Sequence, residues 1–348
     1  MRKKKGPQQA IGLDIGSHSI KYVELTPDPE KIKVTHASIT PLPDASPEAL
    51  KAALKELFKK AQGIKIKKAR ALYPGVRIAI SGPSLLIRKI TLPLMSRLEL
   101  KGAIRFEAES HVPFPIDDCI LDFEILSEVP SEKIMHVLLV AAKRDFIETR
   151  LRLLAEANVY PQAVDVDIFS LSNAIEVINK GQSEKLFGIL NIGHETSLFS
   201  IMLNQQPFFV REVSIGGLEL TKNLAAGKGI SLEEAETFKK EAPEAAYPEL
   251  KTAMQQSFES LADELKNSIS YFEEEHSESL SSIWLAGGGS LSPLLKETLT
   301  EMLGKPVILS APTANVELDE NARDLLSGKN FTQFLVALGM AVSRRDSK

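Results

Sequence analysis

The sequence holds one cysteine, Cys119, and no long apolar run. A single cysteine excludes an internal disulfide and a metal cluster held by several thiolates. The longest apolar stretches, such as residues 137–142, have strand length, whereas a membrane-spanning helix needs about 20 apolar residues. The basic start, residues 1–5, has no apolar segment after it and so does not predict a signal peptide. The chain is therefore expected in the cytoplasm, or at a membrane only through a partner.

A strong charge of one sign is also lacking. The formal net charge of −4 gives no general reason to bind nucleic acid, and none is expected as a partner. Hydrophobic residues make up 43% and charged residues 25%, as in an ordinary globular protein. At 348 residues the chain exceeds the size at which one core stops growing, which predicts two lobes.

The first half predicts a mixed α/β lobe with an inserted module. Residues 11–25 are typical of a strand, a tight turn and a second strand, and Ser46 suits the cap of a following helix. Residues 71–158 combine strand-like runs with a helix opened by the capping box of Ser96 and Glu99. They predict a self-contained α+β module.

The second half begins with a similar set of strands. Residues 187–213 predict a three-stranded meander that opens with a strand, a glycine turn and a strand. Residues 248–276 carry a long helical pattern, and residues 283–286 predict a buried strand before a run of glycines. A helix capped by Ser292 is expected next, and residues 331–342 predict an apolar terminal helix.

Three glycine-bearing turns carry the candidate chemistry. In the first turn, Gly16, Ser17 and Ser19 would present backbone N–H groups and hydroxyls to a phosphate tail. Asp14 would hold a Mg²⁺ ion through water, and Lys21 would return a positive charge to the same phosphates. An ordinary hairpin in which Asp14 satisfies its own turn explains this segment as well.

The second turn, residues 190–196, opens the meander of the second lobe in the same way, with Gly193 at its centre. Two such hairpins that face each other would clamp a triphosphate between the lobes. The two turns together are therefore stronger evidence for a triphosphate site than either turn alone.

The third turn follows the buried strand of the second lobe and consists of Gly287, Gly288, Gly289 and Ser290. Glycines between a strand and a helix N-terminus let the backbone approach a ligand, and the helix dipole favours anionic groups. A flexible connection between strand and helix is the alternative.

In this order and spacing, the three turns resemble the phosphate-1, phosphate-2 and adenosine motifs of the superfamily of actin, heat-shock chaperones and hexokinase. Within it the chain resembles the PilM family of type IV pilus assembly proteins and, more distantly, the FtsA family of cell-division proteins. The module at 71–158 matches the extra subdomain that both families carry. The resemblance runs nearly end to end, on residues 11–16, 90–94, 138–142, 164–167, 211–217, 235–239 and 337–341.

The resemblance implies a two-lobed α/β fold of the actin-like ATPase type, related to ribonuclease H, with an inserted α+β subdomain in lobe one. The start of the chain is expected to be flexible. The implied division is residues 1–10 for that start; 11–70, 159–184 and 331–345 for the core of lobe one; 71–158 for the insert; 185–225 and 281–330 for the core of lobe two; and 226–280 for its helical subdomain.

The resemblance also implies ATP with Mg²⁺ as the ligands, with Asp14 at the metal. Glu236 and Lys239 would contact the ribose and the base edge. The other residues implied around the nucleotide are Asp14, Gly16, Ser17, Ser19, Lys21, Gly193, Thr196, Gly216, Gly217, Gly287, Gly288, Gly289 and Ser290. Without the resemblance, Glu236 and Lys239 would be explained as a solvated helix face. In the same way, His18 and His194 would be ordinary surface residues of their turns.

Three residues are implied in catalysis: Asp14, Asn191 and Asp167. Asp167 lies in the interlobe connection where the superfamily often positions the attacking water, and Asp165 is the alternative there. Many relatives carry Asp where this chain has Asn191. This change removes a negative charge worth roughly 4 kcal/mol at about 4 Å and an effective dielectric near 20. Hydrolysis is therefore expected to be slow or absent, while nucleotide binding survives.

The implied function is that of a cytoplasmic scaffold in the inner-membrane platform that assembles type IV pili. The implied partner is the N-terminal cytoplasmic tail of PilN and, through it, the PilN/PilO complex, with self-association as a further expectation. The alternatives are an FtsA-like filament protein on the membrane and a sugar kinase or phosphatase of the same superfamily. An amphipathic anchoring helix, expected for the first, does not follow the last apolar pattern, since only residues 344–348 remain.

Overall fold

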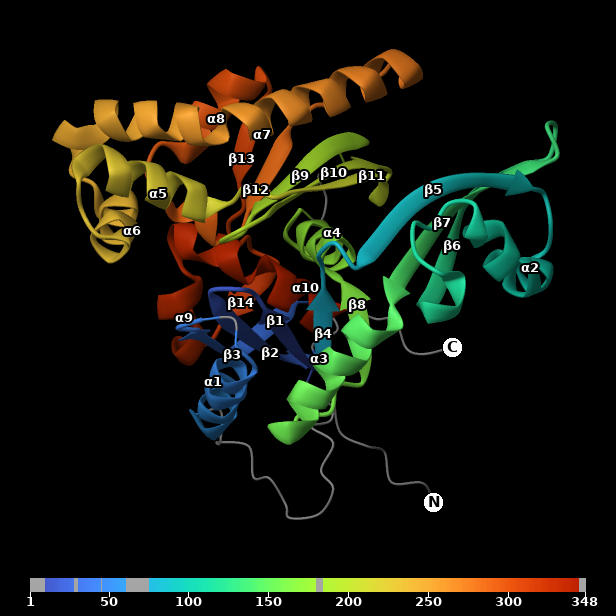
Figure 1. Cartoon of the computed structure of the whole chain (residues 1–348), viewed down its shortest axis with the longest axis horizontal. Coiled ribbons are helices and arrows are strands. Elements are labelled where there is room, and N and C mark those ends of the chain that lie inside the picture. Colours follow the sequence, from blue (N-terminus) through green and yellow to red (C-terminus); the bar gives the residue numbers. More distant parts are fainter. Residues whose placement is uncertain (1–9, 28–30, 45, 61–74, 180–183, 344–348) are drawn as a thin grey trace.

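The computed structural model describes residues 10–27, 31–44, 46–60, 75–179 and 184–343. Two lobes lie one above the other in Figure 1, and a smaller insert projects from one side. The expected flexible start, residues 1–10, lies outside the described ranges except for Ala10.

Lobe one is built on a six-stranded sheet with the order β14-β3-β2-β1-β4-β8. β1 and β2 form an antiparallel hairpin, whereas β4 pairs with β1 and β8 with β4 in parallel. The strands are β1 (Ala10–Ile15), β2 (Ser19–Pro27), β3 (Ile32–Pro41), β4 (Val76–Ile80), β8 (Ala163–Val166) and β14 (Val316–Leu318). The helices are α1 (Pro47–Lys60), α3 (Arg144–Glu156), α4 (Asp167–Ile178), α9 (Glu320–Leu326), the 3₁₀ helix η4 (Gly328–Phe334) and α10 (Leu335–Val342).

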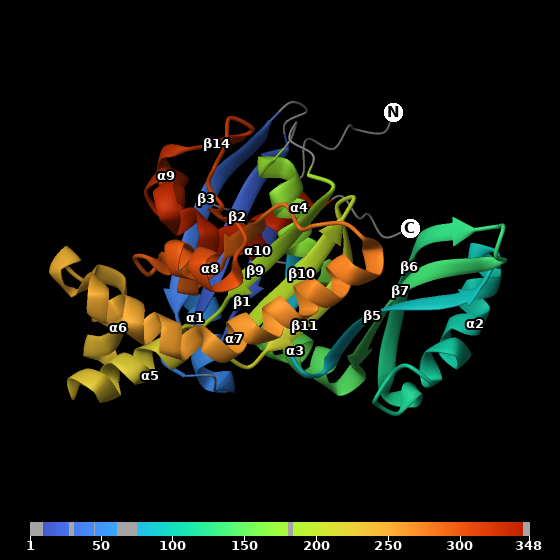
Figure 2. The same ribbon diagram turned by 90° about the horizontal axis from the view of Figure 1, so that it is seen from above.

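Lobe two carries a five-stranded sheet with the order β11-β10-β9-β12-β13. The long helix α7 runs across this lobe, and the insert lies to one side of both lobes when the molecule is seen from above (Figure 2). The strands are β9 (Leu186–Ile192), β10 (Ser197–Leu203), β11 (Gln206–Val213), β12 (Ile283–Ala286) and β13 (Val307–Leu309). The helices are α5 (Gly217–Lys228), α6 (Leu232–Glu241), η2 (Glu244–Ala246), α7 (Tyr247–His276), η3 (Gly288–Leu291) and α8 (Leu295–Leu303).

α4 and α10 lie between the two sheets and carry much of the largest hydrophobic core. Close packing here depends on two glycines. A Cβ on Gly12 of β1 would lie 1.8 Å from the Ala337 carbonyl oxygen, and one on Gly339 would lie 1.7 Å from that of Ser170. α10 can therefore approach β1 and α4 only because these positions have no side chain. This packing fixes β1, which leads into the first turn, relative to α4, which begins at Asp167.

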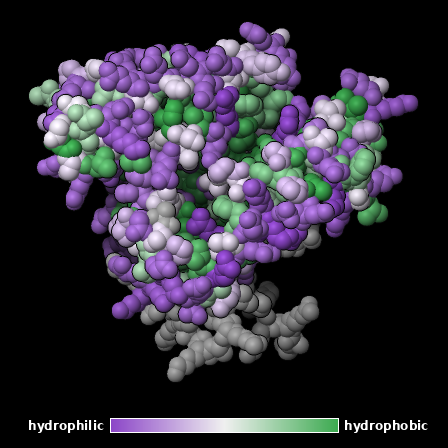
Figure 3. Space-filling view, in the orientation of Figure 1, coloured by the Kyte–Doolittle hydropathy of each residue, from purple (hydrophilic) through white to green (hydrophobic). Residues whose placement is uncertain are grey.

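The insert is a three-stranded antiparallel sheet, β5-β7-β6, with α2 packed on it. Its elements are β5 (Leu85–Pro93), α2 (Arg97–Glu109), η1 (Ile116–Asp118), β6 (Cys119–Val129) and β7 (Ile134–Lys143). The expected capping box is confirmed: Ser96 accepts from the Glu99 N–H, and the Glu99 carboxylate accepts from the Ser96 N–H. Apolar side chains gather at the outer end of the insert (Figure 3). Leu98 and Phe106 of α2 are 81% and 78% exposed.

Several elements differ from the sequence-based expectations. α3, expected in the insert, and α9, expected in lobe two, both pack with lobe one. β4 belongs to the sheet of lobe one, so the insert begins after Ile80 in space rather than at residue 71. β14 was expected in lobe two, yet it pairs with β3 of lobe one. The prediction that Ser292 caps a helix is wrong, because α8 begins at Leu295 and the Ser292 hydroxyl donates to the Lys239 carbonyl oxygen instead. No helix in the described ranges combines the length and the apolar character needed to cross a bilayer.

Candidate functional site

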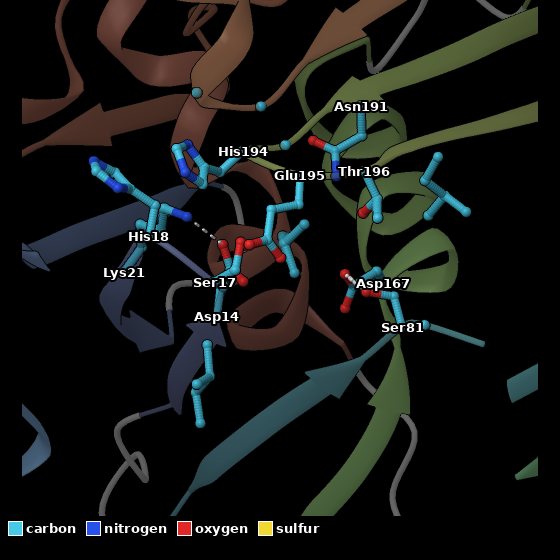
Figure 4. Close-up of a pocket in the computed structure, with 18 of the residues that line it drawn as sticks. Asp14, Ser17, His18, Lys21, Ser81, Asp167, Asn191, His194, Glu195 and Thr196 are labelled. Atoms are coloured by element: carbon cyan, nitrogen blue, oxygen red, sulfur yellow. Dashed lines mark hydrogen bonds and ion pairs between the residues drawn. The ribbon is translucent and has the colours of Figure 1, made fainter. Parts of the chain in front are cut away.

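The two strand–turn–strand hairpins face each other between the lobes. The β1–β2 turn and the β9–β10 turn both contribute to the wall of a cavity of about 330 Å³ (Figure 4). This volume lies at the lower end of the range for small-ligand sites. Ten of the seventeen residues expected at the site line the cavity: Asp14, Gly16, Ser17, Lys21, Asp167, Asn191, Gly193, Thr196, Gly287 and Gly288.

Each turn is closed by one backbone hydrogen bond. The Gly16 N–H donates to the Ser19 carbonyl oxygen at 3.2 Å, and the Gly193 N–H donates to that of Thr196 at 2.9 Å. Within the described ranges, no backbone partner is found for the N–H groups of Ser17, His18, His194 and Glu195. Successive N–H groups of this kind form a concave site for phosphate oxygens. Both turns therefore have the donors that a phosphate tail requires.

Asp14 and Lys21 are cross-strand neighbours in the β1–β2 hairpin. The Lys21 Nζ lies 3.2 Å from the Asp14 Oδ2, and the two side chains are 14% and 15% exposed. The hairpin register thus places a cation and a carboxylate together at the cavity wall. Lys21 neutralises Asp14 in this structure and lies close enough to the turn to contact a bound phosphate.

Asp167 begins α4 and lies across the cavity from the two histidines (Figure 4). Burial and then the nearby Asp14 carboxylate raise the pKa of Asp167 to about 7. The Ser81 hydroxyl donates to Asp167 Oδ2 at 2.7 Å and acts in the opposite direction. A carboxyl group that titrates near neutral pH suits proton transfer. Asp165, the alternative, is not among the described residues that line the cavity.

His18 and His194 join the tips of the two turns. Their rings stack with centroids 4.5 Å apart and planes 23° apart. Burial lowers the pKa of both imidazoles, and for His194 the neighbouring His18 lowers the pKa further. His18 is exposed and His194 is half-buried, as expected for surface turn residues, and their stacked rings also form a direct contact between the lobes.

The glycine turn after β12 requires the absence of side chains. Gly287 has φ +89°, and a Cβ there would lie 2.3 Å from the Ile192 carbonyl oxygen and 2.6 Å from Asn191 Oδ1. Ser290 does not line the cavity; its hydroxyl donates to the Gly287 carbonyl oxygen at 2.6 Å and lies 2.7 Å from Thr332 Oγ1. Ser290 therefore fixes the shape of the turn.

Seven expected residues lie outside the cavity lining: Ser19, Gly216, Gly217, Glu236, Lys239, Gly289 and Ser290. Lys239 is only 4% exposed and donates to the Gly217 carbonyl oxygen at 3.1 Å and to Thr221 Oγ1 at 2.8 Å. It also forms an ion pair with Glu236. Although burial raises the pKa of Glu236, Lys239 and the Thr221 hydroxyl lower it to about 2. A solvated helix face is therefore the wrong explanation for Lys239, which belongs to a buried polar network between α5 and α6.

Several residues that the sequence reasoning missed also line the cavity, among them Ser81, Gly82, Arg150 and Glu212. The Gly82 N–H donates to Glu212 Oε2 at 2.9 Å, which ties the connection between β4 and β5 to lobe two. Burial raises the pKa of Glu212. Ser81 could have been found, because it follows the parallel strand β4, and ligands bind at the carboxyl ends of such strands. No local signal marks Arg150 or Glu212.

The donors at this cavity fit a magnesium nucleotide. Within the described ranges, no three acidic, histidine or cysteine side chains are grouped to hold a metal by themselves. Magnesium in nucleotide sites commonly takes one or two carboxylates together with phosphate oxygens and water. One carboxylate at Asp14, a nearby lysine and two turns with N–H donors match this pattern.

Comparison with known proteins finds similarity along nearly the whole chain. The family profile described as type IV pilus assembly protein PilM matches residues 12–345. A chain in the solved structure of a PilM–PilN type IV pilus biogenesis complex is 28% identical to this chain, with a TM-score of 0.79. That similarity covers 96% of this chain and 97% of the other.

More distant structures share the fold. The ethanolamine utilization protein EutJ from Carboxydothermus hydrogenoformans has 14% identity and a TM-score of 0.57 over 98% of this chain and 91% of its own. MreB5 of Spiroplasma citri, solved with ADP, has 11% identity and a TM-score of 0.52, and the similarity covers 97% of this chain and 96% of the MreB5 chain. The protein EutJ of Escherichia coli (strain K12) is 28% identical over 110 residues, which span 32% of this chain and only 36% of that protein. The expected two-lobed actin-like fold is confirmed.

Proposed function

The chain belongs to the family of type IV pilus assembly protein PilM, and from this premise we propose that it is an actin-like ATP-binding scaffold that recruits the cytoplasmic N-terminal tail of PilN. Through PilN it would act with the PilN/PilO complex, at the cytoplasmic face of the inner membrane. The observation that carries this proposal is the similarity to a chain of the PilM–PilN complex, which covers 96% of this chain and so includes the insert.

Within this proposal, ATP and Mg²⁺ bind in the cavity between the lobes. Asp14 is the residue for the metal, and Lys21 with the free N–H groups of both turns is suited to the phosphates. The glycine turn at Gly287 and Gly288 would lie against the adenosine. Glu236 and Lys239 would stabilise the part of the site that binds the adenosine without contacting the nucleotide. Lys239 donates to the Gly217 carbonyl oxygen and does not reach the cavity.

We propose that hydrolysis is slow. Asn191 lines the cavity at the position where an acidic residue would hold the metal and the attacking water. Asp167, with its pKa of about 7, is the remaining candidate for proton transfer. Bound ATP supplies a polyanion that attracts cationic and N–H groups of both lobes, so its main effect would be on the relative position of the lobes.

The tail of PilN is proposed to dock at the insert or at its junction with the lobes. Four of the seven exposed large hydrophobic side chains in the described ranges lie in the insert: Leu94, Leu98, Phe106 and Ile120. Exposed apolar side chains that gather on one part of a surface are typical of protein interaction sites.

Calorimetry on the purified full chain tests both nucleotide binding and binding of the PilN tail. Mg-ATP and Mg-ADP are titrated first, followed by a synthetic peptide with the sequence of the PilN tail, with a scrambled peptide as the control. We expect saturable binding of nucleotide and of the tail peptide, with ATP turnover below about one per minute, far under the median enzyme rate of about 10 s⁻¹. Absence of tail binding would contradict the scaffold, and ATP consumption that depends on an added sugar would favour a kinase.

A further inference from the structure

Arg150 is a cationic residue that lines the cavity but lies outside the three glycine turns. It lies on α3, which begins directly after β7, the last strand of the insert. The side chain is half-buried and lines the cavity together with Asp14 and Asp167. Those two carboxylates are the charges that act on its guanidinium group, with Asp167 the stronger. Arg150 therefore belongs to the end of the cavity that holds Asp167.

Charge in the cavity is unbalanced toward the acidic side. Its lining contains two long cationic side chains, Lys21 and Arg150, and five carboxylates: Asp14, Asp44, Asp167, Glu195 and Glu212. Lys21 is already paired with Asp14 at 3.2 Å. Arg150, in contrast, has no hydrogen bond, and no carboxylate oxygen within 4 Å, among the residues described by the structure.

Because the Arg150 guanidinium makes no hydrogen bond to the described residues, its N–H groups are available to a ligand in the cavity. Arginine stays protonated in proteins and has five N–H donors in a planar fork, which matches two oxygens of one phosphate group. The carboxylates around it do not supply this match, since none lies within ion-pair distance. An anion that enters the cavity could therefore accept hydrogen bonds from the Arg150 N–H groups, which make none to the described residues.

We propose that Arg150 binds the terminal phosphate of a nucleoside triphosphate, and that the chain thereby favours triphosphate over diphosphate. This inference rests on the proposed nucleotide site. The direction follows from the elements that line the cavity: Gly287 packs against Ile192 and Asn191 of lobe two, whereas Asp167 and Arg150 come from α4 and α3 on the side of lobe one. A nucleotide with its adenosine against the glycines would extend its last phosphate toward Asp167 and Arg150.

The test compares two nucleotides on three variants of the full chain. Affinities for Mg-AMPPNP and Mg-ADP are measured by calorimetry on the unaltered chain and on Arg150→Gln, Arg150→Lys and Arg152→Gln. Arg152 is the matched control, since it lies on the same helix, is exposed, and loses the same charge. We expect Arg150→Gln to weaken AMPPNP binding about 10- to 100-fold, the range for a lost charge-assisted contact, and ADP binding by less than about threefold.

Arg150→Lys keeps the charge but loses the planar fork, so it should retain part of the preference for AMPPNP. If Arg150→Gln does not fold, the ratio of the two affinities in Arg150→Lys decides, and an unchanged ratio overturns the proposal. An equal loss for both nucleotides, or a similar effect of Arg152→Gln, also overturns it. If the unaltered chain binds neither nucleotide, the proposed function fails and this inference falls with it; binding of both with no role for Arg150 rejects the inference alone.

Discussion

The rings of His18 and His194 stack at 4.5 Å across the boundary between the lobes, one from the β1–β2 turn and one from the β9–β10 turn. The contact joins two parts of the chain that are far apart in sequence and that the proposed ligand would bind together. Charged groups of several elements surround it. His18 faces Glu236, Lys240, Lys239 and Lys21, and His194 faces Glu236, Lys239 and Glu195.

The first prediction concerns the pH dependence of this contact. Because burial lowers the pKa of His18 and of His194 below the unfolded value near 6.5, the folded state favours the neutral rings. Their contribution to stability is full above pH 6.5 and is lost as the pH falls through the lowered folded values. We expect the free energy of unfolding, measured in urea, to fall less between pH 7 and pH 5 in the double variant His18→Gln/His194→Gln. Parallel pH profiles for the variant and the unaltered chain would contradict this.

The second prediction concerns Asp167, whose pKa is raised to about 7. The folded state disfavours its ionised form, so the cost of ionisation is absent below the unfolded pKa near 3.9 and grows to a plateau above pH 7. Asp167→Asn should therefore raise the free energy of unfolding at pH 7.5 by on the order of 1–4 kcal/mol, and by little at pH 4. Asp263→Asn, an exposed carboxylate of α7, should change it by less than about 0.5 kcal/mol at either pH. Equal effects of Asp167→Asn at both pH values would contradict the raised pKa of Asp167.

Local features of the fold could be predicted from the sequence because their partners lie within a few residues. Ser96 and Glu99 satisfy each other's N–H groups across one helical turn, and the register of the first hairpin pairs Asp14 with Lys21. Such contacts depend on spacing along the chain alone. The same reasoning failed at Ser292, because a tertiary contact with the Lys239 carbonyl oxygen competes with the expected cap.

The rest of the site depends on how distant elements pack. Glu212 reaches the cavity because β11 lies beside the connection at Gly82, and Arg150 does so because α3 packs against lobe one after the insert. Neither residue stands in a pattern that distinguishes it from other charged residues of its element. The boundary of the insert was misplaced for the same reason, since the pairing of β4 with β1 is not encoded within β4.

The third prediction concerns the glycine turn. Gly287→Ala would place a methyl group 2.3 Å from the Ile192 carbonyl oxygen at φ +89°, so the turn must move. We expect a loss of about 2–4 kcal/mol in the free energy of unfolding, together with weaker nucleotide binding. Gly102→Ala is the control: its site in α2 has nothing within 4 Å, and alanine there should stabilise the helix by about 0.5–1 kcal/mol. A Gly287→Ala chain as stable as the unaltered one would show that the turn is not constrained.

The fourth prediction concerns the buried ion pair of Lys239 and Glu236. Lys239→Met removes the main cation that lowers the pKa of Glu236 to about 2 and leaves this carboxylate with only the Thr221 hydroxyl and the more exposed Lys240 as partners. We expect a loss of about 3–5 kcal/mol at pH 7, because removing one partner of a buried ion pair is strongly destabilising. Lys240→Met removes the more exposed partner of Glu236 and should cost less than about 1 kcal/mol.

The effect of Lys239→Met should also depend on pH. A carboxyl group whose pKa is lowered by folding stabilises the folded state above the unfolded pKa near 4.3, so the loss of stability in Lys239→Met should shrink as the pH falls toward 3. Urea unfolding at pH 7 and pH 3 measures both effects, and a deficit that does not depend on pH would mean that lost packing rather than charge is responsible.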